Sequence, residues 1–387
     1  MHKNVWVLTI AQVFMMSMNS LHVFVGALVG NKIAPSEKLT TLPVASLVVG
    51  TALATVPITM IMRKIGRKRT FLIVGIYSVA VSLLSAYSIS IGSFYMFCSC
   101  AFLLGVTSAS LMQFRFASME SVKPELVPKA ASIVLFGGVV AAFLGPEVAI
   151  WGIDIFSSKF TGSYVLLAVL FGFGLVVLAF YQNTEIVESK SDSSTRSIKG
   201  IAKNPVFWVA VLGAAIGYTV MTFIMTATPV SMHVMDGHSL SDTKWVIQSH
   251  IIAMFLPSLF TGILIKKFGF SKIMISGLIS YLLCIAISYS GHMIHNYWIS
   301  LVLLGIGWNF LFVAGTALLP QSYQESERFK VQALNEFIVF GSQAIAALSA
   351  GMAVFTLGWE RLLLITIPVI VVQFVVIWIW KSKRNNA

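Results

Sequence analysis

Charged residues are scarce in this chain. Asp, Glu, Lys and Arg make up 10% of its 387 residues, whereas 57% are hydrophobic. Soluble domains carry about 25% charged residues, and a soluble fold could not cover this much apolar surface. Cysteine is also scarce, because only Cys98, Cys100 and Cys284 occur and all three lie in apolar runs. The composition therefore excludes a soluble protein and a disulfide scaffold, and it indicates an integral membrane protein.

Motifs for catalysis are missing as well. The chain has no HExxH zinc motif, no Gly-x-Ser-Gly nucleophile motif and no Asp in the middle of an apolar run. No segment outside the apolar runs is long enough for a soluble receptor domain. An intramembrane enzyme and a receptor are therefore remote alternatives, and we expect no cofactor and no metal site.

The long uncharged intervals indicate where the chain spans the membrane, because a charge at the bilayer centre costs at least about 2.5 kcal/mol. Two of the ten long intervals are twice a helix length and are divided by turn-prone sequence at Ser88–Ser93 and Gly291–Asn296. We predict twelve transmembrane helices in an all-α membrane protein. The intervals are 4–31, 39–62, 70–114, 130–146, 160–184, 204–235, 245–265, 273–324, 337–359 and 362–380.

The net charge of +12 does not indicate nucleic-acid binding, because its distribution follows the membrane. With a cytoplasmic N-terminus, 20 of the 26 basic residues fall in cytoplasmic segments and five on the other side. Arg115 is the remaining one and lies inside a span. This split follows the positive-inside rule and predicts that both termini are cytoplasmic.

A shift of about 200 residues superimposes the first six spans on the last six. We predict two pseudo-symmetric six-helix bundles, residues 1–182 and 206–387, joined by a polar cytoplasmic linker at 183–205. Three motifs repeat: Arg63–Arg69 with Lys266–Lys272, Leu103–Gly105 with Leu303–Gly305, and Phe136–Gly137 with Phe340–Gly341.

The six-plus-six pattern and the basic, glycine-centred loops after spans 2 and 8 resemble the major facilitator superfamily over the whole chain. In that family the loop reads Gly-x-x-x-Asp-Arg-x-Gly-Arg-Arg. Here Gly66, Arg67 and Lys68 match its end, but Arg63 stands at the Asp position and Thr59 at the first Gly. This resemblance implies that the loop has a gating role and that its usual acidic partner is missing.

The second copy of the loop keeps Gly262 and Gly269 and carries Lys266, followed by Lys267, where the family has Asp. The span 5 Gly-Pro element of antiporters is half present as Gly145-Pro146. The arginine that many members carry in span 4 is Ala101 here. The usual gating ion pair is therefore in doubt in both halves.

A narrower resemblance, to a bacterial branch of riboflavin and similar organic permeases, rests on LLGIGWNFLFVAGTALLP and ESERFKVQALNEF. The superfamily resemblance implies a secondary transporter that moves a small organic solute by alternating access around a central site. We expect it to act as a monomer in the bacterial inner membrane, and the narrower resemblance favours uptake. We favour proton-coupled uptake, with a proton-driven efflux antiporter as the alternative.

Polar residues inside the spans are the candidate solute contacts. Gln12, Met16, Asn19 and His22 form one stripe on span 1, for which helix–helix contact is the alternative. Arg115 would bind an anionic or carbonyl-rich solute, or would snorkel to lipid phosphates. The other candidates are Tyr218, Thr222, Trp308 and Asn309, with Trp308 either stacking on a planar ligand or packing in the core, and with a backbone break expected at Thr228-Pro229.

Three titratable residues are candidates for proton coupling: Glu147 near the outer end of span 5, Glu336 near the inner end of span 11, and His250 in span 8. The alternatives are a solvated mouth residue for Glu147, a salt bridge to Arg328 or Lys330 for Glu336, and a buried hydrogen-bonded side chain for His250.

Overall fold

Apolar helices dominate the computed structural model, which describes residues 2–123, 126–183, 196–324 and 327–385. Among these residues, ten helices are long and apolar enough to cross a bilayer, and the bent pair α10–α11 makes eleven. The predicted fifth span corresponds to α6, of which Phe136–Trp151 is a shorter apolar helix. The all-α membrane fold predicted from the sequence is confirmed. Most of the predicted linker, residues 184–195, lies outside the described residues.

The chain forms two compact units. The first unit comprises Met1–Val187 with Ser239–Ile251, and the second comprises Glu188–His238 with Ile252–Ala387. Residues 239–251 include the start of the eighth predicted span, 245–265, which is predicted to belong to the second bundle, residues 206–387.

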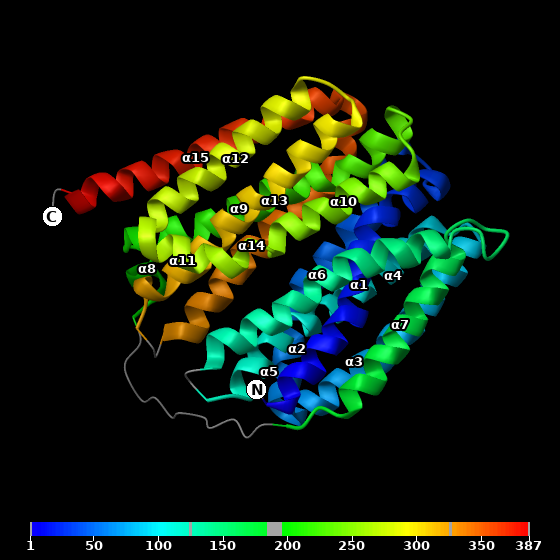
Figure 1. The fold of residues 1–387 in the computed structure, drawn as a ribbon, viewed down its shortest axis with the longest axis horizontal. Helices are drawn as coiled ribbons and strands as arrows, with labels where there is room; N and C mark the ends of the chain where they lie inside the picture. The colour runs from blue at the N-terminus through cyan, green and yellow to red at the C-terminus, as the bar shows by residue number, and fades with distance from the viewer. Residues whose placement is uncertain (1, 124–125, 184–195, 325–326, 386–387) are drawn as a thin grey trace. The chain divides into compact units, whose positions relative to one another are not determined.

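In the first unit, α1 packs on α6, α2 on α4, and α3 on α7 (Figure 1). Pro43 occupies the first turn of α2, where its missing N–H breaks no helical hydrogen bond. The helices are α1 (Lys3–Ile33), α2 (Leu42–Ile65), α3 (Arg67–Ser90), α4 (Phe94–Leu111), α5 (Phe114–Glu120), α6 (Val127–Trp151) and α7 (Thr161–Ala179), with the 3-10 turn η1 (Glu37–Leu39).

In the second unit the corresponding pairs pack together: α9 on α14, α11 on α13, and α12 on α15 (Figure 1). Asn204 caps α9 by accepting from the N–H of Val206. The elements are α8 (Ile198–Ile201), α9 (Pro205–Pro229), the π-helix η3 (Val230–Met235), α10 (Leu240–Phe255), α11 (Ser258–Phe268), α12 (Phe270–Tyr289), α13 (Ile294–Leu318), the 3-10 turn η4 (Leu319–Ser322), α14 (Arg328–Leu357) and α15 (Trp359–Asn385).

The glycines at the centres of the two repeated loops adopt the same backbone conformation. Gly66 joins α2 to α3 with φ 85° and ψ 158°, and Gly269 joins α11 to α12 with φ 84° and ψ 159°. A positive φ of this size disfavours residues with a Cβ. Each glycine also donates its N–H to the end of the preceding helix, at Met62 and Ile265 respectively. The repeat found in the sequence therefore has a backbone counterpart.

Three predicted spans are interrupted. Span 4 divides into α4 and α5 around Met112–Gln113, which the uncharged run does not reveal. Span 7 changes to the π-helix η3 directly after Pro229, at the expected break. Span 8 is expected as a single helix but bends by 43° between α10 and α11. Pro257 lies at this bend, and proline cannot continue the helical hydrogen bonds.

Candidate functional site

The members of the polar stripe predicted on α1 have different surroundings. The Oδ1 atom of Asn19 and the Oε1 atom of Gln12 are buried, and no group in the described part of the chain hydrogen-bonds them. A buried polar atom without a partner costs free energy, so its retention needs a reason such as a ligand or a bound water. These two oxygens mark the part of α1 where a solute could bind.

His22, on the same stripe, is occupied within the protein. Its Nδ1 lies 2.6 Å from the hydroxyl of Tyr164 on α7, and its Nε2 lies 3.1 Å from the carbonyl oxygen of Pro43 on α2. The ring is 1% exposed. Both nitrogens therefore hold α1 to its neighbouring helices, which corresponds to the helix-contact alternative.

Span 5 packs closely against α1. Ser20 on α1 donates a hydrogen bond to the carbonyl oxygen of Ala141 on α6, at 2.8 Å. A Cβ at Gly145 would collide with the carbonyl oxygen of Ser17 and the hydroxyl of Ser20. The glycine of the Gly145-Pro146 element therefore has a packing role in addition to any role in exchange.

Arg115 lies in the first turn of α5, directly after the break in span 4. Its side chain is half-buried, its Nε is buried with no partner in the described residues, and its guanidinium carbon lies 4.7 Å from the ring centre of Phe116. A guanidinium always carries its charge and offers five N–H donors. The first unit thus provides a half-buried cationic donor on α5, with a buried Nε, in addition to two unpartnered oxygens on α1.

The second unit provides an aromatic cluster around Trp308 on α13. Its indole stacks on Phe312 at 4.9 Å and 16°, and meets Tyr218 of α9 edge-on at 5.2 Å and Phe255 of α10 at 5.7 Å. Phe340 of α14 lies 5.9 Å from Tyr218. Trp308 is 3% exposed and its Nε1 has no partner in the described residues. Because Phe312 covers one ring face, the indole N–H is the group that Trp308 has available for a ligand.

Asn309, next to Trp308, uses its side-chain amide to hold the bent span. Its Nδ2 donates to the carbonyl oxygen of Met254 at 2.7 Å and to the hydroxyl of Ser258 at 2.6 Å, and its Oδ1 accepts from Thr261 at 2.6 Å. These partners flank the bend between α10 and α11. Asn309 therefore stabilises the bend, and both the amide nitrogen and the amide oxygen already bond protein groups.

Thr222 is buried on α9, four residues after Tyr218, so the two share a helix face. The second unit therefore brings Tyr218 and Trp308 into direct contact, with Thr222 one turn away, while Asn309 points to the bend.

Glu147 forms an ion pair that the sequence does not reveal. Lys244 on α10 donates to its Oε1 at 2.7 Å, and Gln248 Nε2 lies 3.4 Å from the same oxygen. Gln248 also donates to the carbonyl oxygen of Phe143, at 3.1 Å. The carboxylate is 35% exposed, which is well below that of a freely solvated side chain. The interaction joins α6 to the part of α10 that belongs to the first unit.

The other two coupling candidates lie far apart in the chain. His250 is fully buried on α10, within the first unit, and Glu336 is half-buried on α14, in the second unit. The described part of the chain contains no group of three His, Cys, Asp or Glu side chains placed to hold a metal ion.

Both halves carry an arginine–carboxylate clamp, and in the first half the arginine, Arg67, belongs to the loop with a predicted gating role. In the first unit, Arg67 donates to both oxygens of Glu120 at the end of α5, at 2.8 and 2.6 Å, and the N–H of Lys68 donates to Asn183 at 2.9 Å. Glu120 therefore pairs with the loop arginine in a chain whose own Asp position holds Arg63. A sequence signal existed, because Glu120 is the first acidic residue after Glu37.

In the second unit, Arg196 donates to both oxygens of Glu327, at 2.8 and 2.7 Å. The Arg196 hydrogen bond, helped by the N–H of Gln324, lowers the pKa of Glu327 to about 2. Since this pKa is lowered, the clamp stabilises the fold fully above pH 4.5 and loses its contribution as the pH falls toward 2. Lys266 and Lys267 lie in the last turn of α11, and the Lys267 ammonium lies 5.2 Å from the ring of Phe268.

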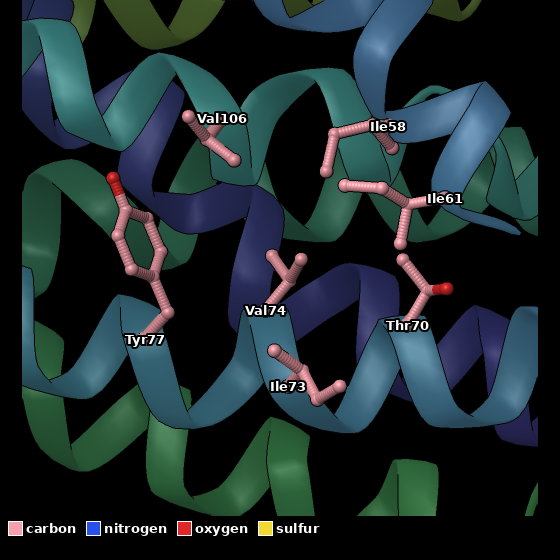
Figure 2. A pocket seen from close by; sticks show the side chains of 7 residues that line it. All are labelled: Ile58, Ile61, Thr70, Ile73, Val74, Tyr77 and Val106. Carbon is pink, nitrogen blue, oxygen red and sulfur yellow. The ribbon is translucent and has the colours of Figure 1, made fainter. Parts of the chain in front are cut away.

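An apolar crevice of about 180 Å³ opens between α2, α3 and α4 (Figure 2). Tyr77 directs its hydroxyl to the carbonyl oxygen of Leu103 on α4, at 3.0 Å. The lining residues present apolar atoms to the crevice, so we do not assign it to transport. They are Ile58, Ile61, Thr70, Ile73, Val74, Tyr77 and Val106.

Comparison with known proteins identifies the class. The family model described as Major Facilitator Superfamily matches residues 7–247 and 233–387. The chain therefore belongs to the major facilitator superfamily, which is a family of transporters and not of enzymes.

The chain is also similar to individual transporters of known sequence or structure. The chain is 34% identical over 376 residues to the riboflavin transporter RfnT of Brucella anthropi, an alignment that covers 96% of this chain and 94% of that protein. Among solved structures it is similar to a variant of the nucleoside transporter NupG, with a TM-score of 0.78, 11% identity and coverage of 97% and 99%. It is also similar to a bacterial homolog of the human lysosomal transporter Spinster in an inward-facing, unoccupied conformation, with a TM-score of 0.71, 13% identity and coverage of 97% and 96%. These structures support the fold.

Proposed function

We propose that this protein takes up a planar, carbonyl-rich organic solute of the riboflavin type across the bacterial cytoplasmic membrane, by proton-coupled alternating access. The observation that carries the proposal is the 34% identity to a riboflavin transporter along nearly the whole chain. A flavin ring has carbonyl oxygens along one edge and a flat aromatic face, so its recognition requires donors and aromatic contacts.

The unpartnered groups of each unit fit such a solute. In the first unit, Arg115 and Asn19 offer a cationic donor and an amide, and in the second unit Trp308 offers an indole N–H within an aromatic cluster that includes Tyr218. Thr222 is a further candidate contact on α9. We leave His22 and Asn309 out of the solute contacts because their polar atoms are already used by the protein.

Coupling is assigned to Glu147, with Glu336 and His250 as the other candidates. In this structure Lys244 neutralises the Glu147 carboxylate. A proton can replace Lys244 as the neutralising partner when α6 and α10 separate, which would couple protonation to a conformational change.

The transport test uses a riboflavin-requiring bacterial host that lacks its own uptake system. We expect the chain to support growth and accumulation of labelled riboflavin, and a protonophore to abolish that accumulation. Absence of uptake above the empty-vector level, with the protein verified in the membrane, would contradict the proposal. Thermal-shift measurements on the purified protein with riboflavin and nucleosides separate binding from transport, because a ligand at 100 times its Kd stabilises by about 2.7 kcal/mol.

Efflux by proton antiport is the second candidate, favoured by the Gly145-Pro146 element. Inside-out and right-side-out vesicles with imposed pH gradients distinguish the two directions. Uptake predicts solute movement with the proton gradient into right-side-out vesicles, whereas antiport predicts accumulation in inside-out vesicles.

The topology we propose places both termini in the cytoplasm, with the protein acting as a monomer. Lys199 and Lys159 are exposed and lie on opposite predicted sides, and the three native cysteines are buried. In intact spheroplasts, an impermeant thiol reagent should label Lys159→Cys but not Lys199→Cys. The reverse labelling pattern would overturn the assignment of the loops.

A further inference from the structure

A polar cluster at one end of the second unit is used neither by the proposed solute site nor by the coupling candidates. It consists of Asp236 after η3, His292 in the turn between α12 and α13, Tyr297 on α13, and Glu360 at the start of α15. His292 Nδ1 lies 2.8 Å from Asp236 Oδ2, and its Nε2 lies 2.7 Å from Glu360 Oε1. One imidazole thus joins two carboxylates from different elements, and we call this group the His292 cluster.

Further hydrogen bonds fix the positions of the acids and the ring. Tyr297 donates to Asp236 Oδ2 at 2.7 Å, and its hydroxyl lies 2.6 Å from that of Ser231 in the π-helix. The N–H of Asp236 bonds the carbonyl of Ser231, which continues the wide turns of η3. His238 Nε2 contacts the carbonyl oxygen of His292 at 2.7 Å. The π-helix therefore places Asp236 where His292 meets it.

The hydrogen-bond inventory determines the charge of the ring. Ionised carboxylates only accept hydrogen bonds, and a neutral imidazole has only one N–H to donate. When both carboxylates are ionised, oxygens at 2.7 and 2.8 Å from opposite ring nitrogens need an N–H on each nitrogen, so the ring that satisfies both contacts is an imidazolium. If the ring loses its proton, one nitrogen presents a lone pair to a carboxylate, and that contact becomes repulsive.

We propose that His292 is a proton-binding site, and that its protonated form fastens the α12–α13 turn to η3 and α15. Deprotonation releases one of the two carboxylates and loosens this end of the second unit. The site is separate from the proposed solute site, and its test needs no solute. On the predicted topology it faces the outside of the cell, so external pH would control it.

The electrostatics agree with the geometry. Partial burial lowers the pKa of His292, but the hydrogen bonds and charges of Asp236 and Glu360 outweigh burial, so the pKa is raised above 6.5. A raised histidine pKa stabilises the fold fully below pH 6.5, and this contribution is lost as the pH rises through the raised value. The cluster should therefore be closed in acid and should open in mild alkali.

Other titratable groups surround the cluster and must be distinguished from His292. His233 in η3 contacts the carbonyl oxygen of His238 at 2.7 Å, and His238 itself bonds the backbone of His292. Arg361 follows Glu360, and His295 is exposed three residues after His292. Because histidines alone ordinarily titrate near neutrality, His295 provides the matched control.

The experiment uses the full chain purified in detergent, with nitrogen NMR of labelled histidines and thermal unfolding followed from below pH 6.5 to well above it. We expect one histidine with both ring nitrogens protonated at neutral pH, and its signal should be absent in His292→Gln. In the wild type and in His295→Gln, the Tm should fall as the pH rises through the value at which half of the His292 rings are deprotonated (the His292 midpoint). This pH-dependent fall, which we call the Tm step, should be missing in His292→Gln. A His292 midpoint at or below 6.5 would overturn the proposal, as would an unchanged Tm step in His292→Gln.

Glu360→Gln keeps the proposal falsifiable if His292→Gln does not fold. It retains the ring and a side chain of the same size but removes one negative charge. The His292 midpoint and the Tm step should both move to lower pH, and both should remain visible. An unmoved midpoint would mean that Glu360 does not hold the proton on His292, and the cluster as proposed would fail.

Discussion

The two units differ in how they use the polar side chains of their central helices. In the first unit, Asn19 and Arg115 keep buried atoms without protein partners among the described residues, whereas in the second unit Asn309 makes three hydrogen bonds around the bend of α10–α11. The second unit instead offers a ligand the indole N–H of Trp308. The two halves of the duplicated scaffold thus differ: the first keeps buried polar atoms without protein partners among the described residues, and the second combines aromatic packing with a reinforced bend.

Neutralising the proposed coupling acid of each unit should have the largest effect. Glu147→Gln should reduce concentrative uptake by about tenfold or more while leaving solute binding within about twofold, because only the charge that exchanges partners is removed. Glu336→Gln is the matched change in the second unit and should have the smaller effect. Accumulation and pH dependence that remain normal in Glu147→Gln would remove it as the coupling residue and leave His250 to be tested.

Removing the cationic donor of the first unit should follow in size. Arg115→Ala should weaken solute binding by about 1.5 kcal/mol, or roughly tenfold, since a hydrogen bond to a charged group is lost from a half-buried site. Arg115→Lys keeps the charge but loses the planar fork, so it should recover part of the affinity. Titration calorimetry gives both values. Wild-type affinity in both variants would show that Arg115 only contacts lipid phosphates.

A pair of asparagines tests the comparison most directly. Asn309→Ala should destabilise the protein by about 2 kcal/mol, because three buried hydrogen bonds are lost and membrane hydrogen bonds average about 0.6 kcal/mol each. Asn19→Ala should leave the Tm nearly unchanged and reduce solute affinity instead. Thermal unfolding and binding measured on the same two preparations decide this, and the opposite pattern would reverse the roles assigned to the two units.

Removing the indole N–H of Trp308 should have the smallest effect on solute binding. Trp308→Phe retains an aromatic ring within the cluster but removes the donor, so it should cost about 1 kcal/mol of binding, roughly fivefold. Trp308→Ala should cost about 1 to 3 kcal/mol if the ring itself contacts the solute. Equal affinities of wild type and Trp308→Phe would reduce Trp308 to a packing residue.

The helical membrane fold could be predicted from the sequence because a charged side chain inside the bilayer costs free energy. The uncharged intervals can therefore be identified directly along the chain. The repeated loops could also be located from the sequence, because the positive φ at positions 66 and 269 favours glycine at both, and Gly66 and Gly269 mark the loops. Partners distant in the chain could not be predicted, because they depend on how helices pack. Lys244 is paired with Glu147 and Glu120 with Arg67 only in three dimensions.

Helix packing also decides which of the predicted site residues keep a free polar atom, and the sequence could not predict this. The periodicity of α1 identified a polar face, but it could not separate His22, held by Tyr164 and Pro43, from Asn19, whose Oδ1 stays unpartnered among the described residues. The sequence does not reveal the His292 cluster, because His292 lies in the turn that divides the interval 273–324, and its carboxylate partners Asp236 and Glu360 lie just beyond the ends of two other intervals.

The equal torsions of Gly66 and Gly269 show what the two loops have in common. The acidic position of the loop holds a base in both copies, Arg63 in one and Lys266 in the other, while both copies keep the glycine. The two halves of this chain therefore share a bend of the main chain and differ from the family pattern in the charge beside it. In this chain the glycine, and not an acidic side chain, is the common element of the two loops.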